Sequence, residues 1–406
     1  MPTPLPRIAR FESMAYGLFI HYGLYSLLER DAWLQFMERT PVAEYEKLAA
    51  RFTAEQFDAR DIVRLTKAAG MRYITFTARH HEGFSLYDTR GLSRFDTMQT
   101  AAKRDLVAEL VAACRAEGIA PFLYHTTLDW RWDSANCDAA QFRDYLDYLH
   151  ASVELLCTRY GPIGGLWFDG NWSRPQADWQ EDRLYAMIRR HQPDAIIINN
   201  TGMFAPGVIG HPELDAVTFE NCPAAPIRPT GKHVAAETCQ PLNNHWGFAR
   251  HDFNYIGPAQ IIQQLAHSRK VGANYLLNIG LTGAGAIPAY ERAALERVGE
   301  WVALVAPALY DGRPTGYECE GRDFILNANG TLYYFAHDLA IAGAENTTIA
   351  VGRTGPRVIK GLPRELRAAR WLDNGESLTV TGGNTVHLTG HPYGTNYVVR
   401  VAELVM

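Results

Sequence analysis

The sequence predicts an α/β fold: a (β/α)8-like (TIM-type) barrel over residues 1–310, followed by an antiparallel β-sandwich over residues 311–406. Two observations support this prediction. Up to about residue 310, short apolar runs alternate with segments of helical periodicity, as parallel strands joined by helices do. Beyond that point, short runs of alternating polarity are separated by Asn-Gly, Gly-Gly and Pro, which indicates antiparallel strands and turns.

The barrel strands are predicted from apolar runs that end at a polar residue or a turn. The clearest is 164–170, where a glycine pair precedes Leu-Trp-Phe, and Asp169 and a further glycine follow. An apolar run bounded by glycines is typical of a strand buried in a parallel sheet. The predicted strands are, in order, 15–23, 73–81, 120–127, 164–170, 195–200, 216–220, 234–238 and 273–278.

The helices between these strands are predicted from apolar residues at helical spacing. In 103–117, for example, Leu106, Leu110 and Cys114 recur on one face, and Gly118 ends the segment. The predicted helical segments are 41–69 (two helices), 103–117, 138–159, 178–191, 258–271 and 289–307. The stretch 201–257 is long and irregular for connections between strands, so we expect it to help form a functional site.

The C-terminal region is predicted to contain strands but no helix. Its alternating runs are 323–326, 331–335, 347–351, 377–380, 386–388 and 397–401.

Composition narrows the functional classes. The net charge of −5 is small and the charges are interspersed, so neither a nucleic-acid nor a membrane partner is expected. Residues 1–10 contain no apolar signal region, and the six cysteines form no C-x-x-C pair. We therefore expect free thiols and a cytoplasmic location, or a secreted or periplasmic one if the chain is a mature form.

Polar side chains gather at the ends of the predicted strands. In a barrel of this class, the carboxyl ends of the strands meet at one face, where catalytic residues lie. One such side chain is more often structural than functional, but a group containing histidines and carboxylates favours a site. The residues are His21, His80, His81, His125, Asp169, Asn199, Asn200, Glu220, Glu237 and Asn278.

Several kinds of site lack their sequence motif. The chain contains no H-x-H or H-E-x-x-H pattern, so a metal is not expected, although His21, His125 and Asp169 could still assemble a metal site in space. It also contains no G-x-S-x-G elbow and no G-x-x-x-x-G-K-[ST] loop. The sequence therefore predicts neither a cofactor nor a bound nucleotide.

Paired carboxylates are the remaining chemistry. Glycoside hydrolysis needs two acids that flank one bond, one ionised and one protonated. Asp169 is the candidate nucleophile, although an Asp at such a position more often caps a helix or a turn. Glu220 and Glu237 are candidates for the second acid and Glu82 is a weaker one; their spacing alone does not choose between them.

Six blocks of the sequence resemble the family 29 α-L-fucosidases, in order, from about residue 15 to residue 305. The blocks are 17–26 (GLFIHYGLYS), 77–88 (TARHHEGFSLYD), 165–170 (GLWFDG), 237–239 (ETC), 246–247 (WG) and 274–280 (NYLLNIG), with G-x-G-x-I-P over 283–288.

The resemblance implies a retaining exo-α-L-fucosidase that acts on a fucosylated oligosaccharide or glycoconjugate, in a catalytic barrel over residues 1–310. It implies that Asp169 is the nucleophile, and order along the chain ranks Glu220 above Glu237 as the acid/base. The residues that it implies, or leaves as candidates, for substrate binding are His21, Trp33, His80, His81, His125, Trp167 and Glu237. The alternatives are an α-L-galactosidase-like activity in the same pocket, a non-catalytic carbohydrate-binding protein, and a metal-dependent hydrolase.

Overall fold

The computed structural model describes residues 3–227, 231–341 and 352–406. The chain divides into two compact units. The first comprises residues 1–256 with 274–296, and the second comprises residues 257–273 with 297–406. The second unit thus includes helical residues that precede residue 310. The domain division that the sequence predicts at residue 310 stays a prediction.

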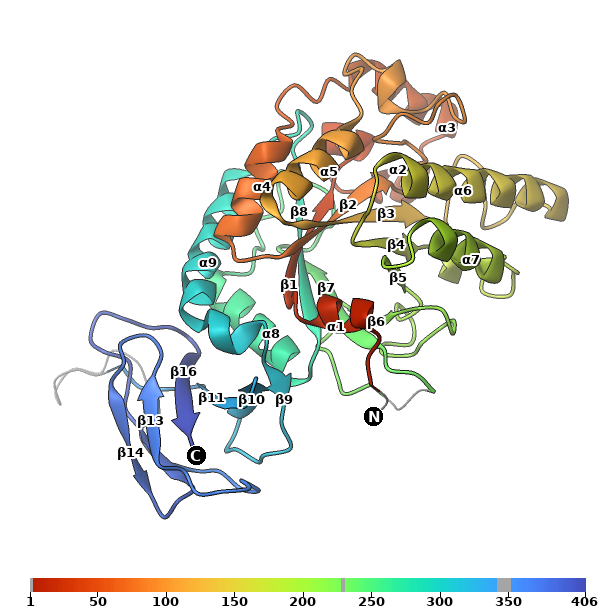
Figure 1. The fold of residues 1–406 in the computed structure, drawn as a ribbon. Helices are drawn as coiled ribbons and strands as arrows, with labels where there is room; N and C mark the ends of the chain where they lie inside the picture. The colour runs from red at the N-terminus through yellow and green to blue at the C-terminus, as the bar shows by residue number, and fades with distance from the viewer. Residues whose placement is uncertain (1–2, 228–230, 342–351) are drawn as a thin grey trace. The chain divides into compact units, whose positions relative to one another are not determined.

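In the described part of the chain, eight parallel strands close into a barrel in sequence order, with the last strand beside the first (Figure 1). This confirms the predicted TIM-type barrel. The strands are β1 (Tyr16–His21), β2 (Tyr73–Arg79), β3 (Ala120–Thr126), β4 (Gly165–Asp169), β5 (Ile196–Asn199), β6 (Ala216–Glu220), β7 (Ala235–Pro241) and β8 (Asn274–Gly280).

Large aromatic side chains fill the barrel interior, among them Phe19, Tyr73, Phe122, Tyr124 and Trp167. Glycines on neighbouring strands make room for these rings. A Cβ atom on Gly17 would lie 2.3 Å from Tyr73 Cζ, and one on Gly165 would lie 2.4 Å from the Phe122 ring. These two glycines are therefore required by packing inside the barrel, since no larger side chain fits.

The helices connect the strands as predicted, with different ends. Asp58, Asp105 and Asp138 each accept hydrogen bonds from backbone N–H groups of a first turn, and so fix where three of these helices begin. The helices are α2 (Leu34–Met37), α3 (Val42–Tyr45), α4 (Ala59–Ala68), α5 (Leu106–Glu117), α6 (Ala139–Arg159), α7 (Glu181–His191), α8 (Pro258–Lys270) and α9 (Ala289–Leu309). The 3-10 helices are η1 (Leu24–Leu28), η2 (Glu46–Arg51), η3 (Thr97–Gln99) and η4 (Asn171–Ser173). Around the barrel, α4 lies beside α5 and α6 beside α7 (Figure 1).

A short N-terminal helix, α1 (Pro6–Glu12), was not predicted from the sequence. Its residues Ile8 and Phe11 join the apolar cluster inside the barrel. The Phe11 ring lies 5.5 Å, between centroids, from the ring of Tyr73, the first residue of β2. The backbone carbonyl of Phe11 accepts a 2.7 Å hydrogen bond from the side chain of Asn274, the first residue of β8. The helix thus closes the end of the barrel at which the strands begin. Two apolar residues in one turn are too weak a periodic signal to predict a helix.

The C-terminal strands form one antiparallel sheet within the described residues, in the order β12-β15-β14-β13-β16-β11-β10-β9. The first residues of β14 pair with β13 and its last residues pair with β15, so β14 belongs to both halves of a curled sheet. The halves share a buried core that includes Tyr334, Trp371 and Val386, and this confirms the predicted sandwich-type domain. The strands are β9 (Arg313–Pro314), β10 (Phe324–Ala328), β11 (Thr331–Ala336), β12 (Gly355–Val358), β13 (Ala368–Trp371), β14 (Ser377–Thr381), β15 (Thr385–Leu388) and β16 (Arg400–Val405).

Two details of the C-terminal prediction are wrong. The last strand begins at Arg400, not at residue 397, and its pairing with β11 sets that position. The strands β9, β12 and β13 were not predicted, because β9 has two residues, and β12 and β13 have four each with Gly, Pro or Arg among few apolar ones. The predicted strand 347–351 lies outside the described residues.

All six cysteines lie in the described ranges and are free thiols, as predicted. Among the residues that the structure describes, no helix is both long enough and apolar enough to cross a bilayer.

The substitution Phe11→Ala tests the role of α1. Phe11 is fully buried, so the cavity that it leaves should lower the free energy of unfolding by about 3–5 kcal/mol. Urea denaturation followed by tryptophan fluorescence measures this loss. The control Leu5→Ala removes a side chain that is 43% exposed just before the same helix, and it should change stability by less than about 1 kcal/mol. Equal effects of the two substitutions would contradict the assigned role.

Candidate active site

The carboxylate of Asp169 lies at the end of β4, where the chain turns sharply. The next residue, Gly170, has φ = 109°, a left-handed conformation that favours glycine. A Cβ atom there would lie 2.4 Å from the backbone nitrogen of Leu128. The glycine of the Trp-Phe-Asp-Gly run is therefore needed for the turn that leaves the Asp169 side chain 14% exposed at the mouth of the barrel.

Asp169 is surrounded by hydrogen-bond donors. Its Oδ1 accepts from Trp172 Nε1 at 2.8 Å and from Asn200 Nδ2 at 3.2 Å. Its Oδ2 accepts from the Tyr124 hydroxyl at 3.0 Å and lies 3.4 Å from His81 Nε2. Burial opposes ionisation, but the contacts with His81, Trp172 and Tyr124 outweigh it and hold the pKa of Asp169 below its ordinary value. Asp169 is thus a carboxylate at neutral pH.

Glu220, at the end of β6, shares one hydrogen-bond donor with Asp169. Asn200 Nδ2 donates to Glu220 Oε2 at 2.5 Å as well as to Asp169 Oδ1. The amide carries two hydrogens, so each carboxylate receives one. Thr218 Oγ1 donates to Asn200 Oδ1 at 2.9 Å, and this bond keeps the amide nitrogen turned toward the two acids. The arrangement places the two carboxyl groups side by side.

The two acids differ in charge because their surroundings differ. Burial and then the negative charge of Asp169 raise the pKa of Glu220 to about 7, against the hydrogen bond from Asn200, which lowers it. Asp169 receives three hydrogen bonds, whereas the closest donor to Glu220 is that single amide. One acid is therefore ionised while a large fraction of the other is protonated near neutrality.

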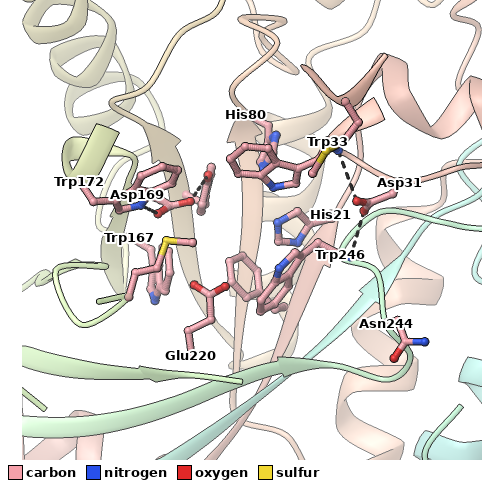
Figure 2. A pocket seen from close by; sticks show the side chains of 14 residues that line it. His21, Asp31, Trp33, His80, Trp167, Asp169, Trp172, Glu220, Asn244 and Trp246 are labelled. Carbon is pink, nitrogen blue, oxygen red and sulfur yellow. Dashed lines mark hydrogen bonds between the residues drawn. The ribbon is translucent and has the colours of Figure 1, made fainter. Parts of the chain in front are cut away.

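Both carboxylates point into one cavity of about 380 Å³, with His21 and His80 on its other side (Figure 2). This volume is within the range of small-molecule sites. The residues that line the cavity are Phe19, His21, Asp31, Trp33, Met37, His80, Tyr124, Trp167, Asp169, Trp172, Met203, Glu220, Asn244 and Trp246. Six predicted site residues are among them: His21, Trp33, His80, Trp167, Asp169 and Glu220.

The two histidines of the cavity wall are neutral. Burial lowers the pKa of His21 to about 3, although the hydrogen bond with Asn278 opposes that shift. His21 Nδ1 lies 2.6 Å from Asn278 Oδ1, while the Asn278 amide nitrogen donates to Trp246 O at 2.7 Å. Nδ1 must therefore carry the hydrogen, and Nε2 is left as an acceptor. Burial, followed by the neighbouring His81 and His21, holds the pKa of His80 well below its ordinary value.

Three predicted substrate-binding residues lie behind the cavity wall. His81 Nδ1 is 2.7 Å from Thr126 Oγ1, and the ring approaches Asp169. His125 contacts Ser152 Oγ through Nε2 at 2.8 Å and is fully buried. Glu237 is fully buried too and accepts from Trp167 Nε1 at 2.8 Å and from the Tyr73 hydroxyl at 2.7 Å. Burial raises the pKa of Glu237 to about 7.

The sequence contained a signal for one residue that the prediction missed. Side chains alternate along a strand, and the register pairs Tyr124 with Trp167 and His125 with Phe168. Tyr124 therefore points into the barrel with Trp167, and His125 points outward. The period of two should have favoured Tyr124 over its neighbour. Met37 and Trp172 were missed because their helices, of four and three residues, are too short for a periodic pattern, and Trp246 was missed because it lies on a loop.

Among the described residues, no three His, Cys, Asp or Glu side chains are placed to hold one metal ion. The cavity wall contains no Arg or Lys in the part of the chain that the structure describes.

Comparisons with known proteins agree on one family. A family model described as Alpha-L-fucosidase matches residues 4–306. The tissue alpha-L-fucosidase of Rattus norvegicus is 28% identical over 344 residues, which cover 78% of this chain and 72% of the relative. Alpha-L-fucosidase isoenzyme 1 from Paenibacillus thiaminolyticus has 28% identity and a TM-score of 0.82 over 98% of each chain. A further solved structure that shares the fold is a trapped covalent intermediate of an alpha-L-fucosidase GH29 from Bacteroides thetaiotaomicron, in complex with 2-fluoro-fucosyl fluoride. Its TM-score is 0.83 at 22% sequence identity, and the match covers 99% of this chain and 96% of that one.

Proposed function

The chain belongs to the alpha-L-fucosidase family of glycoside hydrolases, and from that premise we propose that it is a retaining exo-α-L-fucosidase with Asp169 as nucleophile and Glu220 as acid/base. The observation that carries the proposal is the single amide of Asn200, which donates to both carboxylates. It brings together one ionised and one protonatable acid, the pair that glycoside hydrolysis requires.

The spacing of the two acids supports retention. The oxygens that accept from Asn200 Nδ2 are no farther apart than the sum of the two bonds, 3.2 and 2.5 Å. One oxygen of each carboxyl group thus lies closer to the other than the roughly 6.5 Å group separation at which the range for inverting enzymes begins, and this favours the roughly 5–5.5 Å spacing of retaining ones. An inverting enzyme needs a larger gap to admit a water molecule between the sugar and the base.

In the first step, a carboxylate oxygen of Asp169 attacks the anomeric carbon while the bond to the leaving oxygen breaks. Glu220 gives its proton to that oxygen. Its Oε2 accepts the short bond from Asn200, whereas Asn221 Nδ2 lies 3.5 Å from Oε1, so Oε1 is the oxygen with the weaker acceptor bond and the better placed to carry the proton. In the second step, water attacks the same carbon while Glu220 takes its proton, and the bond between that carbon and the Asp169 oxygen breaks. Each acid thus returns to its starting state after one turnover.

Other residues of the wall suit a fucosyl unit. His21 offers an acceptor at Nε2, and neutral His80 has one ring nitrogen, Nε2, for the cavity because its Nδ1 is buried, so the two can bind hydroxyl groups directionally. Trp33 and Trp167 present apolar ring surface to the sugar. We assign to His81 the role of holding Asp169 in place. We assign His125 and Glu237 to the layer behind the cavity wall, because hydrogen bonds to protein groups engage their polar atoms.

The galactoside, carbohydrate-binding and metal-dependent alternatives stay predictions, as does the cellular location.

The acid/base assignment predicts how Glu220→Ala responds to the leaving group. For fucosides with a poor leaving group, such as fucosyl disaccharides, kcat/KM should fall by roughly 10²–10⁴-fold, because the departing oxygen is no longer protonated. For an aryl fucoside with an acidic phenol, kcat/KM should change little. The control Glu237→Gln should lower kcat/KM to a similar extent for both substrates. If Glu237→Gln shows the leaving-group dependence and Glu220→Ala does not, the assignment is wrong.

The shared amide predicts the pH dependence of Asn200→Ala. Activity needs Asp169 ionised and Glu220 protonated, so kcat/KM of the wild type should fall above a pH of about 7 as Glu220 loses its proton. The Asn200 hydrogen bond stabilises the ionised form of Glu220, so its removal should raise the pKa of Glu220. The alkaline limb should then move up by about one pH unit, the equivalent of ~1.4 kcal/mol.

The neighbouring Asn199 provides the control for this experiment. Its amide nitrogen donates to the Tyr185 hydroxyl at 3.0 Å and to Glu181 at 3.2 Å, and it contacts neither Asp169 nor Glu220. Asn199→Ala should leave both limbs of the pH profile in place, even if stability falls. An unmoved alkaline limb in Asn200→Ala, or an equal movement in Asn199→Ala, would contradict the coupling through Asn200.

A further inference from the structure

The mouth of the cavity is bordered by five apolar side chains from separate parts of the chain. We call Trp33, Phe36, Met37, Trp172 and Phe204 the apolar collar. Trp33, Met37 and Trp172 line the cavity itself. Phe36 meets the Trp33 ring edge-on with centroids 5.7 Å apart, and Phe204 meets Trp172 edge-on at 5.9 Å. The collar is therefore continuous with the cavity wall and extends outward from it.

The outer collar is unusually exposed for residues of its kind. The exposed fractions are 56% for Phe36, 70% for Met37 and 75% for Phe204. By contrast, His21, His80 and Trp167 at the inner wall are at most 3% exposed. Contiguous apolar groups that stay in water beside a pocket are typical of a ligand-binding surface, since a ligand that covers them removes that surface from water.

The collar is fixed relative to the proposed nucleophile. Trp172 Nε1 donates to Asp169 Oδ1 at 2.8 Å, so its ring cannot turn without loss of that bond. Trp33 stacks on Trp172 with centroids 6.0 Å apart and an angle of 21° between the rings. A group that binds against the collar is thus held at a defined place with respect to the bond that Asp169 attacks.

We infer that the apolar collar is the subsite for the leaving group, and that it recognises a flat apolar face, either an aryl ring or the C–H face of a pyranose. This inference rests on the proposed function. An exo-acting enzyme encloses the terminal sugar, so the rest of the substrate has only the mouth through which to extend. Aromatic side chains bind ring faces by dispersion and by C–H contact with their π surface.

The charge of the site argues against one other class of leaving group. Asp31, Asp169 and Glu220 line the cavity, and no Arg or Lys among the described residues does so. A phosphate or nucleotide leaving group needs cations or a row of N–H donors. The collar therefore favours uncharged aryl and sugar groups over glycosyl phosphates.

The test compares substrates that differ only in the leaving group. α-L-Fucosyl fluoride has nothing to place on the collar, whereas an aryl α-L-fucoside and a fucosyl disaccharide do. In the double variant Phe36→Ala with Phe204→Ala, the ratio of kcat/KM for a ring-bearing substrate to that for the fluoride should fall roughly fivefold to fiftyfold, mainly through KM. The two ring-bearing substrates show which kind of ring the collar binds.

The control is Tyr393→Ala, which removes a ring that is 73% exposed in the other compact unit and does not line the cavity. It should leave the ratio unchanged. A ratio that falls for either ring-bearing substrate supports the inference. A ratio that stays constant for both, or that falls equally in Tyr393→Ala, overturns it. Hydrolysis of the fluoride by the wild-type protein reports on the proposed function separately, so failure of one claim is distinguishable from failure of the other.

Discussion

The structure of the site depends on one constraint: two carboxyl groups that share a single hydrogen-bond donor cannot both be ionised without mutual repulsion. Asn200 holds Asp169 and Glu220 together, and burial keeps water from screening their charges. One of the two must keep its proton near neutrality. The surroundings decide which one, because His81, Trp172 and Tyr124 stabilise the charge on Asp169, whereas Glu220 has the bond from Asn200 as its closest donor.

The barrel supplies the rigidity that this pair needs. Asp169 and Glu220 end strands β4 and β6, and Asn200 directly follows β5, which lies between them in the sheet. The three side chains are therefore placed by the hydrogen bonds of neighbouring parallel strands. Below them, Glu237 accepts from Trp167, so the cavity floor is held by a buried carboxylate from β7. Each layer fixes the orientation of the layer above it, which is how a preformed catalytic site is maintained.

Much of this could be predicted from the sequence, for definite reasons. The eight barrel strands were predicted because apolar runs with polar ends are strong local signals, and Asp169 and Glu220 were found as polar strand ends. The role of Asn200 could not be predicted, because it follows from the distance between strands and not from any motif. Glu237 and His125 were predicted to contact substrate, yet both form hydrogen bonds to protein groups behind the cavity wall. The end of a strand can be located from the sequence, but the sequence does not show whether a side chain there reaches the cavity or is buried behind its wall. Helix α1 was missed because its stabilisation comes from burial of Phe11, which is a tertiary effect.

The central claim, that Asp169 is the nucleophile of a retaining mechanism, is tested most directly by trapping the intermediate. Incubation with 2-deoxy-2-fluoro-α-L-fucosyl fluoride should leave a 2-fluorofucosyl group esterified to the protein, because the fluorine slows hydrolysis of the ester. Peptide mass spectrometry should then locate that group on Asp169, and an Asp169→Asn variant should acquire none. A label on any other residue, or rapid turnover of fucosides with inversion at the anomeric carbon, would contradict the account.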